Sequence, residues 1–208
     1  VGPSAYQRGL AVGRRSAQVL AAAAHGDAHH QDVDHQQVQN AADHGQLGCH
    51  VLQVIDDQRQ LIATESGLFI RDRASGSLSL HVAIEAERTE TRSNDGRVHP
   101  SGALWIGTMG KALEPGAGSL YHVAKGKVTV LYTGLSIPNG ICFSPDGATG
   151  YFVDTGDNLY KRVALDPQTG LPVGKPDVII DASGLDGGMD GAVCDAAGDL
   201  WNAHWGMG

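Results

Sequence analysis

A unit that recurs every 43 to 50 residues constrains the fold of this chain more than any other feature of its sequence. Each unit has a tight turn followed by an apolar pair, and these pairs are Leu61-Ile62, Leu104-Trp105, Gly150-Tyr151 and Leu200-Trp201. A second apolar segment follows in three of the units, at residues 67–69, 119–122 and 158–161. Repeats of about 40 to 50 residues made of short strands are typical of β-propellers, in which each repeat forms one blade. We therefore predict an all-β chain with about four propeller blades.

Individual strands can be traced from about residue 48 onward. Apolar runs at 51–55, 61–63, 67–72 and 78–82 are separated by polar turns, at 56–59 and 74–76 among others. The apolar residues alternate with a period of two rather than the period of a helix, which excludes a helical solenoid. An ordinary β-sandwich with similar turns is the alternative, although a sandwich does not need its turns to repeat at this period.

The length, charge and cysteine content limit the class of protein. A chain of 208 residues can bury the core of one domain, or of two. The formal net charge of -8 disfavours nucleic acid and anionic membranes as partners. No apolar run approaches the roughly 20 residues that span a bilayer. The three cysteines, Cys49, Cys142 and Cys194, include no closely spaced pair, so we expect buried thiols at Cys142 and Cys194 and a cytoplasmic location.

Residues 1–46 differ in composition from the rest of the chain. There is no Glu before Glu65 and no Lys before Lys111, and six of the ten histidines fall within the first 50 residues. We predict that 1–46 is an atypical leader outside the fold, disordered or produced by a reading-frame error, and that 47–208 is a partial propeller domain. Two alternatives stay open: a transition-metal site among the His and Asp residues of 25–35, and an export signal that begins at Arg14-Arg15. A short helix is expected near residues 16–24, and we read the whole chain as a fragment of a longer one.

Three polar residues recur at nearly the same place in successive units. Asn94, Asn139 and Asp190 precede Trp105, Tyr151 and Trp201 by 11, 12 and 11 residues, and each lies next to or close to a glycine. The first strand of a propeller blade lies near the central axis, so equivalent residues of successive blades point to a common place. Each residue alone is readily explained as a turn residue. Together they predict a site whose oxygen donors suit a hard divalent cation.

Several motifs of the chain resemble those of a known family. The stretches that carry the resemblance are Arg92-Ser93-Asn94-Asp95-Gly96, Trp105-Ile106-Gly107-Thr108-Met109, Ile137-Pro138-Asn139-Gly140, Tyr151-Phe152-Val153-Asp154, Met189-Asp190-Gly191 and Gly198-Asp199-Leu200-Trp201. In order and spacing they resemble the senescence marker protein (regucalcin), gluconolactonase and luciferin-regenerating-enzyme family, and within it the bacterial sugar-lactone hydrolases most closely. The resemblance covers about Gly48 to Gly208. It implies a six-bladed β-propeller, which needs on the order of 270 residues and is therefore incomplete here.

The resemblance also implies a function and a set of site residues. It implies metal-dependent hydrolysis of a sugar lactone, such as gluconolactone or arabinonolactone, to the aldonic acid. Asn139 and Asp190 match two ligands of one divalent cation, for which calcium is the first expectation and zinc, magnesium and manganese are alternatives. Asp190 also matches the catalytic general base. Arg92 and Asn94 match the pair that binds the substrate, a small-molecule sugar lactone.

The chain departs from the family pattern at two places. The family's metal-binding Glu lies in an N-terminal Gly-Glu-Gly-Pro type motif, which is absent here, so the third metal ligand is not identified. An acidic substrate contact of some members is also absent, because the corresponding loop reads Gly110-Lys111-Ala112. These departures keep two alternatives open. One is a calcium-binding regulatory protein without turnover, and the other is a related six-bladed esterase or phosphotriesterase.

Overall fold

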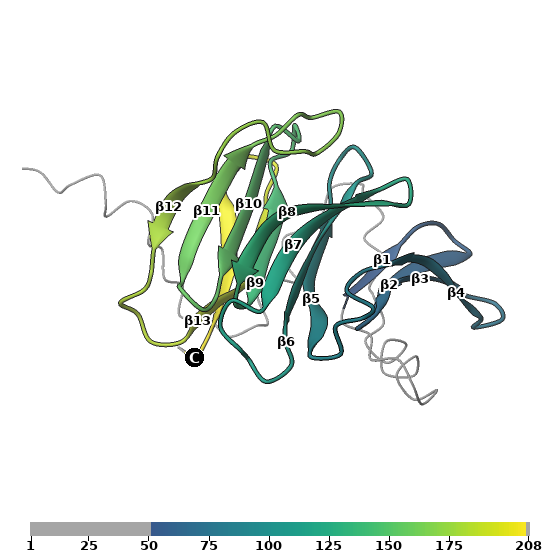
Figure 1. Ribbon diagram of the computed structural model, residues 1–208. Coiled ribbons are helices and arrows are strands. Elements are labelled where there is room, and N and C mark those ends of the chain that lie inside the picture. Colours follow the sequence, from purple (N-terminus) through teal and green to yellow (C-terminus); the bar gives the residue numbers. More distant parts are fainter. Residues whose placement is uncertain (1–50, 207–208) are drawn as a thin grey trace, which may run out of the picture. The chain divides into compact units, whose positions relative to one another are not determined.

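The computed structural model describes residues 51–206, which form fourteen strands and no helix (Figure 1). Within this range there is accordingly no helix long and apolar enough to cross a membrane. Some expectations concern residues outside the described range. They are those for the leader at 1–46, the helix near 16–24, the His and Asp cluster at 25–35, and Cys49.

The strands form three four-stranded sheets and one two-stranded sheet, all antiparallel and each built from consecutive strands. The first sheet contains β1 (Val51–Val54), β2 (Arg59–Ala63), β3 (Gly67–Asp72) and β4 (Leu78–Ala83). The second contains β5 (Thr91–Val98), β6 (Leu104–Gly110), β7 (Gly118–Ala124) and β8 (Lys127–Leu135). The third contains β9 (Pro138–Phe143), β10 (Thr149–Asp154), β11 (Leu159–Ala164) and β12 (Asp177–Asp181). The last contains β13 (Gly188–Cys194) and β14 (Leu200–Trp205).

Short-range sequence signals explain the boundaries of these strands. The strands predicted at 51–55, 61–63, 67–72 and 78–82 correspond to β1, β2, β3 and β4, although β2 begins earlier, at Arg59. The turn between β1 and β2 is stabilised by Asp56, whose carboxylate accepts hydrogen bonds from the backbone N–H groups of Gln58 and Arg59 at 2.9 and 2.8 Å. An aspartate that binds the backbone two or three residues ahead is a common way to close such a turn.

The first strands of successive sheets lie next to one another. β1 contacts β5, β5 contacts β9, and β9 contacts β13. In a β-propeller the first strand of each blade occupies this position, beside the central axis. The arrangement therefore brings together the three strands that carry Asn94, Asn139 and Asp190.

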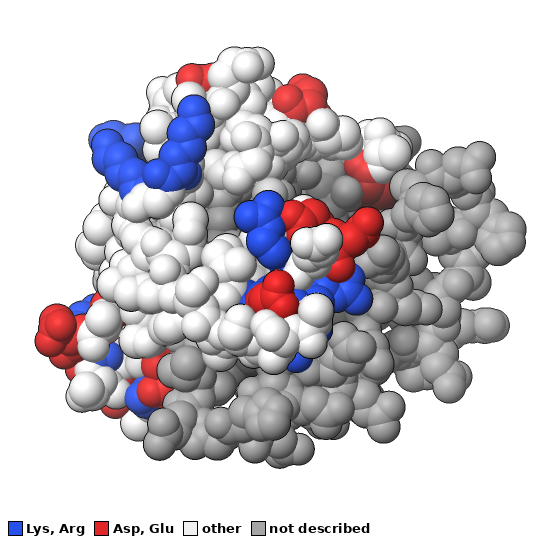
Figure 2. All heavy atoms as spheres, turned by 90° about the vertical axis from the view of Figure 1, so that its right-hand side faces the viewer, with Lys and Arg blue, Asp and Glu red and all other residues white. Residues whose placement is uncertain are grey.

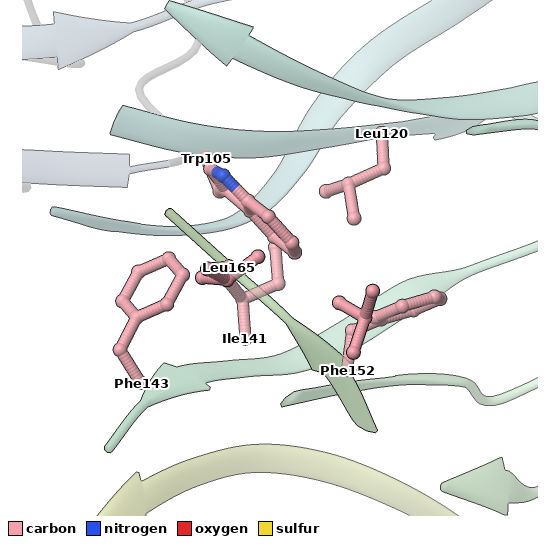
Figure 3. Close-up of a cluster of buried hydrophobic side chains, with 7 residues drawn as sticks. Trp105, Leu120, Ile141, Phe143, Phe152 and Leu165 are labelled. Atoms are coloured by element: carbon pink, nitrogen blue, oxygen red, sulfur yellow. The ribbon is translucent and has the colours of Figure 1, made fainter. Parts of the chain in front are cut away.

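The second and third sheets share an apolar core built around Trp105 (Figure 3). Trp105 is fully buried, and its indole N–H donates a hydrogen bond to the Gly170 carbonyl at 2.9 Å. The ring packs edge-on against Phe143, with centroids 5.2 Å apart. A Cβ at Gly150 would lie 3.1 Å from the indole ring, so the glycine at this strand position makes room for the tryptophan. The remaining members of the cluster are Leu120, Ile141, Phe152, Val163 and Leu165.

Figure 2 shows the charged side chains on one face of the molecule. On the face shown in Figure 2, acidic and basic residues occur in small groups separated by uncharged ones. Within residues 51–206, Arg59 pairs with Asp56 at 2.7 Å and Lys161 with Asp157 at 2.9 Å. Exposed pairs of this kind contribute little to stability. The described part of this face presents no extended surface of one charge.

Replacement of Trp105 by Ala should destabilise the fold far more than the same change at Trp201. Trp105 is 0% exposed and Trp201 is 61% exposed, although both lie on the second strand of their sheets. Emptying the buried position should lower the free energy of unfolding by about 3–5 kcal/mol. At Trp201 the loss should stay below about 1 kcal/mol. Urea denaturation of both variants measures the difference, and equal losses would contradict the core assignment.

Candidate active site

A β-bulge interrupts the first strand of each of the last three sheets. The strand register shifts between Ser93 and Gly96 in β5, between Asn139 and Cys142 in β9, and between Met189 and Ala192 in β13. In each case two residues of the first strand lie opposite one residue of the second. A bulge re-aims side chains and leaves backbone groups outside the ladder, and bulges are common beside functional sites.

The register corrects the predicted equivalence of the three polar residues. Asn94 and Asp190 are the first residues of their bulges, whereas Asn139 is the last paired residue before its bulge. The expectation that Trp105 is equivalent to Tyr151 is wrong, because the register makes Trp105 equivalent to Gly150. The reason lies in the pairing across the turn, because Phe143 pairs with Gly150, seven residues later, whereas Arg97 pairs with Trp105, eight residues later.

Asn94 and Asn139 nevertheless lie in direct contact across β5 and β9. The Asn94 Nδ2 donates to Asn139 Oδ1 at 2.9 Å and to the Pro138 carbonyl at 3.1 Å. Arg92 joins the same group, because its Nη1 donates to Asn94 Oδ1 at 3.2 Å and to the Ser93 carbonyl at 2.9 Å. Asn139 is buried, whereas Arg92 and Asn94 are partly exposed. Three of the four predicted site residues thus form one hydrogen-bonded chain.

Asp190 lies on the neighbouring strand β13, beside the bulge of β9. Its backbone carbonyl oxygen is 3.1 Å from the place that a Cβ at Gly140 would occupy. Its residue surface is exposed, and the bonds around it within residues 51–206 use the backbone: Asn202 Nδ2 donates to the carbonyls of Asp190 and Gly191 at 2.9 and 3.2 Å. Asp190 is therefore an exposed residue whose backbone is held by Asn202.

Gly140 permits the close approach of β9 to β13. Its φ of +60° lies in the left-handed region, and an added Cβ would lie 2.8 Å from Tyr160 Cε2. The Tyr160 hydroxyl donates to the Gly140 carbonyl at 2.8 Å, which satisfies a backbone group inside the bulge. The Asn-Gly pair was a candidate turn signal in the sequence, but here it serves a bulge within a strand, for which glycine is sterically required.

Sequence reasoning missed the contribution of Asp95 and Arg97, which connect the same strands. Asp95 follows Asn94 in the bulge, and its carboxylate accepts from the Ile141 N–H at 2.8 Å. Arg97 donates to the carbonyls of Ile141 and Ala192, at 3.4 and 3.0 Å. Burial raises the pKa of Asp95, and the nearby negative charge of Asp190 acts in the same direction, against the hydrogen bonds and Arg97. The only sequence feature that could have pointed to this role was the position of Asp95 in the Asn-Asp-Gly motif.

Two further residues at the end of β10 hold the start of β9, and neither was assigned a role from the sequence. The Asp154 carboxylate accepts backbone N–H groups of Ser136, Ile137 and Gly156 at 2.8 to 3.0 Å. The Thr155 hydroxyl contacts the Asn139 side chain. Asp154 belongs to a motif that resembled the family, and its bonds give that motif a physical role, which is to fix the segment that leads into Asn139.

The proposed ligand atoms of the site are of the types that a hard divalent cation prefers. An amide oxygen at Asn139 and a carboxylate at Asp190 are the ligand types that calcium and magnesium prefer. Residues 51–206 contain no group of three or more His, Cys, Asp or Glu side chains placed to hold a metal. Two protein ligands are few for calcium, which takes six to eight oxygens. A complete site would need donors beyond these two, from water, substrate or other residues.

The two thiols within the described range lie near this region without taking part in it. Cys142 is buried, as predicted, and burial raises the pKa of its thiol to about 11. Cys194 is only partly buried, so the expectation for this residue was too strong. A thiol with a raised pKa is a poor nucleophile, because the thiolate is the reactive form.

The raised pKa of Asp95 predicts a pH dependence of stability. A carboxyl whose pKa is higher in the folded than in the unfolded state contributes stability at low pH, and loses it as the pH rises through the folded value. The free energy of unfolding of the unaltered protein, relative to Asp95→Asn, should therefore fall as the pH rises above about 4, the ordinary pKa of an aspartate.

The matched control for this measurement is Asp181→Asn. A hydrogen bond from the Ser183 hydroxyl lowers the pKa of Asp181, so its contribution should change with the opposite sign and be lost as the pH falls. Urea denaturation at several pH values measures both differences. A flat difference for Asp95 would show that its carboxyl is not held in a buried environment.

The chain matches one protein family and is similar to several named proteins. The family described as "SMP-30/Gluconolactonase/LRE-like region" matches residues 16–208, a range that begins inside the predicted leader. A protein of Rhizobium meliloti (strain 1021) named "Putative sugar lactone lactonase" is 58% identical over 156 residues, which are 75% of this chain and 53% of that protein. The "6-deoxy-6-sulfogluconolactonase" of Pseudomonas putida is 34% identical over 162 residues, which are 77% of this chain and 54% of that protein.

A solved structure shows the same arrangement of strands. The crystal structure of a calcium-binding protein, regucalcin, from Agrobacterium tumefaciens strain C58 matches with a TM-score of 0.77 and 62% identity. The match covers 78% of this chain and 55% of that one. The chain thus spans about half the length of the curated relatives that it matches.

Proposed function

Because this chain belongs to the SMP-30/gluconolactonase/LRE-like family, we propose that it contributes to a lactonase site that opens sugar lactones with the help of a divalent cation. The single observation that carries the proposal is the hydrogen bond between Asn94 and Asn139 at 2.9 Å, which joins the predicted substrate-binding pair to a predicted metal ligand. The names of the two relatives, both lactonases of sugar derivatives, support the same reaction class.

The substrate side of the site is formed by Arg92 and Asn94. The hydrogen bonds of Arg92 to Ser93 and Asn94 use only Nη1, and a guanidinium carries five N–H donors. Among residues 51–206 no hydrogen-bond partner is found for Nε or Nη2, so these donors are the ones proposed to face a ligand. A polar, hydroxyl-bearing sugar lactone offers acceptors for them, whereas an apolar ester would leave these donors without partners.

The chain's own residues supply the acid–base steps. When bound, a divalent cation supplies a Lewis acid that polarises the lactone carbonyl and lowers the pKa of water. Asp190 takes a proton from water as the water oxygen bonds to the carbonyl carbon. The guanidinium of Arg92 pairs with the negative charge that develops on the oxygen. The ring C–O bond then breaks, the leaving oxygen takes up the proton that Asp190 accepted from water, and the product is the open-chain aldonic acid.

Replacement of Asp190 by Asn should abolish most of the hydrolysis. An amide cannot accept the proton of water, and loss of a general base typically lowers kcat by about 10²- to 10⁴-fold. The measurement is hydrolysis of gluconolactone and arabinonolactone by the chain at saturating calcium, followed by acid release. Asp199→Asn, in the exposed turn before β14, is the matched control and should keep its activity. Normal turnover by Asp190→Asn would remove the assigned role.

A calcium-binding protein without turnover is the second candidate. It is favoured by the two oxygen donors without a third identified ligand, and by the description of the related Agrobacterium tumefaciens protein as calcium-binding. Calorimetry with calcium, followed by addition of a lactone, separates the two candidates. Calcium binding without any acid release would support this one, whereas acid release that stops on addition of a chelator would support the lactonase.

The proposed cation is calcium, and the proposed location of the protein is the cytoplasm. Calcium is the first choice over zinc, because both proposed ligands are oxygen donors and zinc prefers nitrogen and sulfur. Magnesium and manganese also accept oxygen donors. A panel that includes sugar lactones, carboxylic esters and phosphotriesters would distinguish a lactonase from a related six-bladed esterase.

A further inference from the structure

Thr155 connects the two strands that carry the proposed metal ligands. It lies in the turn directly after β10, and its hydroxyl makes two hydrogen bonds. Oγ1 accepts from Asn139 Nδ2 at 2.9 Å and donates to the Met189 carbonyl at 2.6 Å. A threonine hydroxyl has one hydrogen. Because that hydrogen goes to the Met189 carbonyl, Thr155 can meet Asn139 only as an acceptor.

The hydroxyl thereby fixes the orientation of the Asn139 side-chain amide. The nitrogen of the amide must face Thr155, so the oxygen faces Asn94, whose Nδ2 lies 2.9 Å from it. An amide oxygen has two lone pairs, and Asn94 occupies one of them. The other is left for a cation, as the proposed ligand role of Asn139 requires. A flipped amide would present N–H groups to the cation instead.

The same hydroxyl holds the peptide that precedes Asp190. The Met189 carbonyl accepts from Thr155, and the Met189 N–H donates to Asn158 Oδ1 at 2.9 Å. Both sides of this residue are therefore held by the turn between β10 and β11. The γ-methyl of Thr155 packs against Gly188, where an added Cβ would lie only 2.6 Å from it, so packing also restricts the threonine rotamer.

We propose that Thr155 is a positioning residue that sets the Asn139 amide and the Asp190 backbone in the geometry needed for one cation. The proposal rests on the proposed function, because it concerns the same pair of ligands. Residues that orient metal ligands typically change metal affinity by about 10- to 100-fold when they are replaced. A threonine that served only the stability of the turn would not change the affinity in this way.

The test compares Thr155→Val, which keeps the shape but loses the hydroxyl, with Thr155→Ser, which keeps the hydroxyl. Calcium titration by calorimetry should show affinity weaker by about 10- to 100-fold for Thr155→Val, and nearly unchanged affinity for Thr155→Ser. Thr64→Val is the matched control. Thr64 is buried, and its hydroxyl also donates to a carbonyl, that of Gly67 at 3.1 Å, and accepts one N–H, that of Ser66 at 3.3 Å. Its loss should leave calcium affinity unchanged.

A second measurement follows the Asn139 side-chain amide by NMR without any metal. In Thr155→Val the amide signal should shift and its hydrogens should exchange faster with solvent, whereas Thr155→Ser and Thr64→Val should resemble the unaltered protein. An unshifted signal, or unchanged calcium affinity in Thr155→Val, overturns the proposal. If the unaltered chain binds no calcium, the proposed metal site fails, and the positioning of Asn139 then stands or falls on the NMR result alone.

Discussion

The rest of the site depends on one constraint, which is that the backbone groups left unpaired by the bulges in β5, β9 and β13 need hydrogen-bond partners. Buried N–H and C=O groups need hydrogen-bond partners, and a bulge removes them from the ladder. Here side chains of neighbouring strands supply those partners. Asp95 accepts from the Ile141 N–H, Arg97 donates to the Ile141 carbonyl, and Tyr160 donates to the Gly140 carbonyl. The sheets are thus joined through the same few residues that shape the site.

One consequence is that stability and site geometry depend on shared hydrogen bonds. The bond between Asn94 and Asn139 joins the second sheet to the third, and the bond from Thr155 to Met189 joins the third to the last. A substitution in this network removes a link between sheets and a constraint on the site at once. Measurements on such variants therefore need a stability readout beside a binding or activity readout, because residues of one network do not act additively.

Much of the fold could be predicted from the sequence. The repeat of turn and apolar pair predicted an all-β propeller, and the family resemblance implied that it is an incomplete one of six blades. An all-β, incomplete propeller is confirmed by sheets of consecutive antiparallel strands and by the related regucalcin structure. The family predicted from the motifs is confirmed by the match over residues 16–208. The strand register was less accessible, since the bulges and the pairing across the turn after β9 change which residues face each other without changing the apolar pattern.

The sequence by itself determined which strands exist and which residue types stand near the axis, because alternation and turn chemistry are local properties. Only the tertiary structure decided which polar groups meet. Asn94 contacts Asn139, Asp95 and Arg97 reach into the next sheets, and Thr155 holds both Asn139 and Met189. These contacts join strands that are far apart in the chain. Such contacts depend on bulges and on the close approach of β9 to β13, which no local pattern encodes.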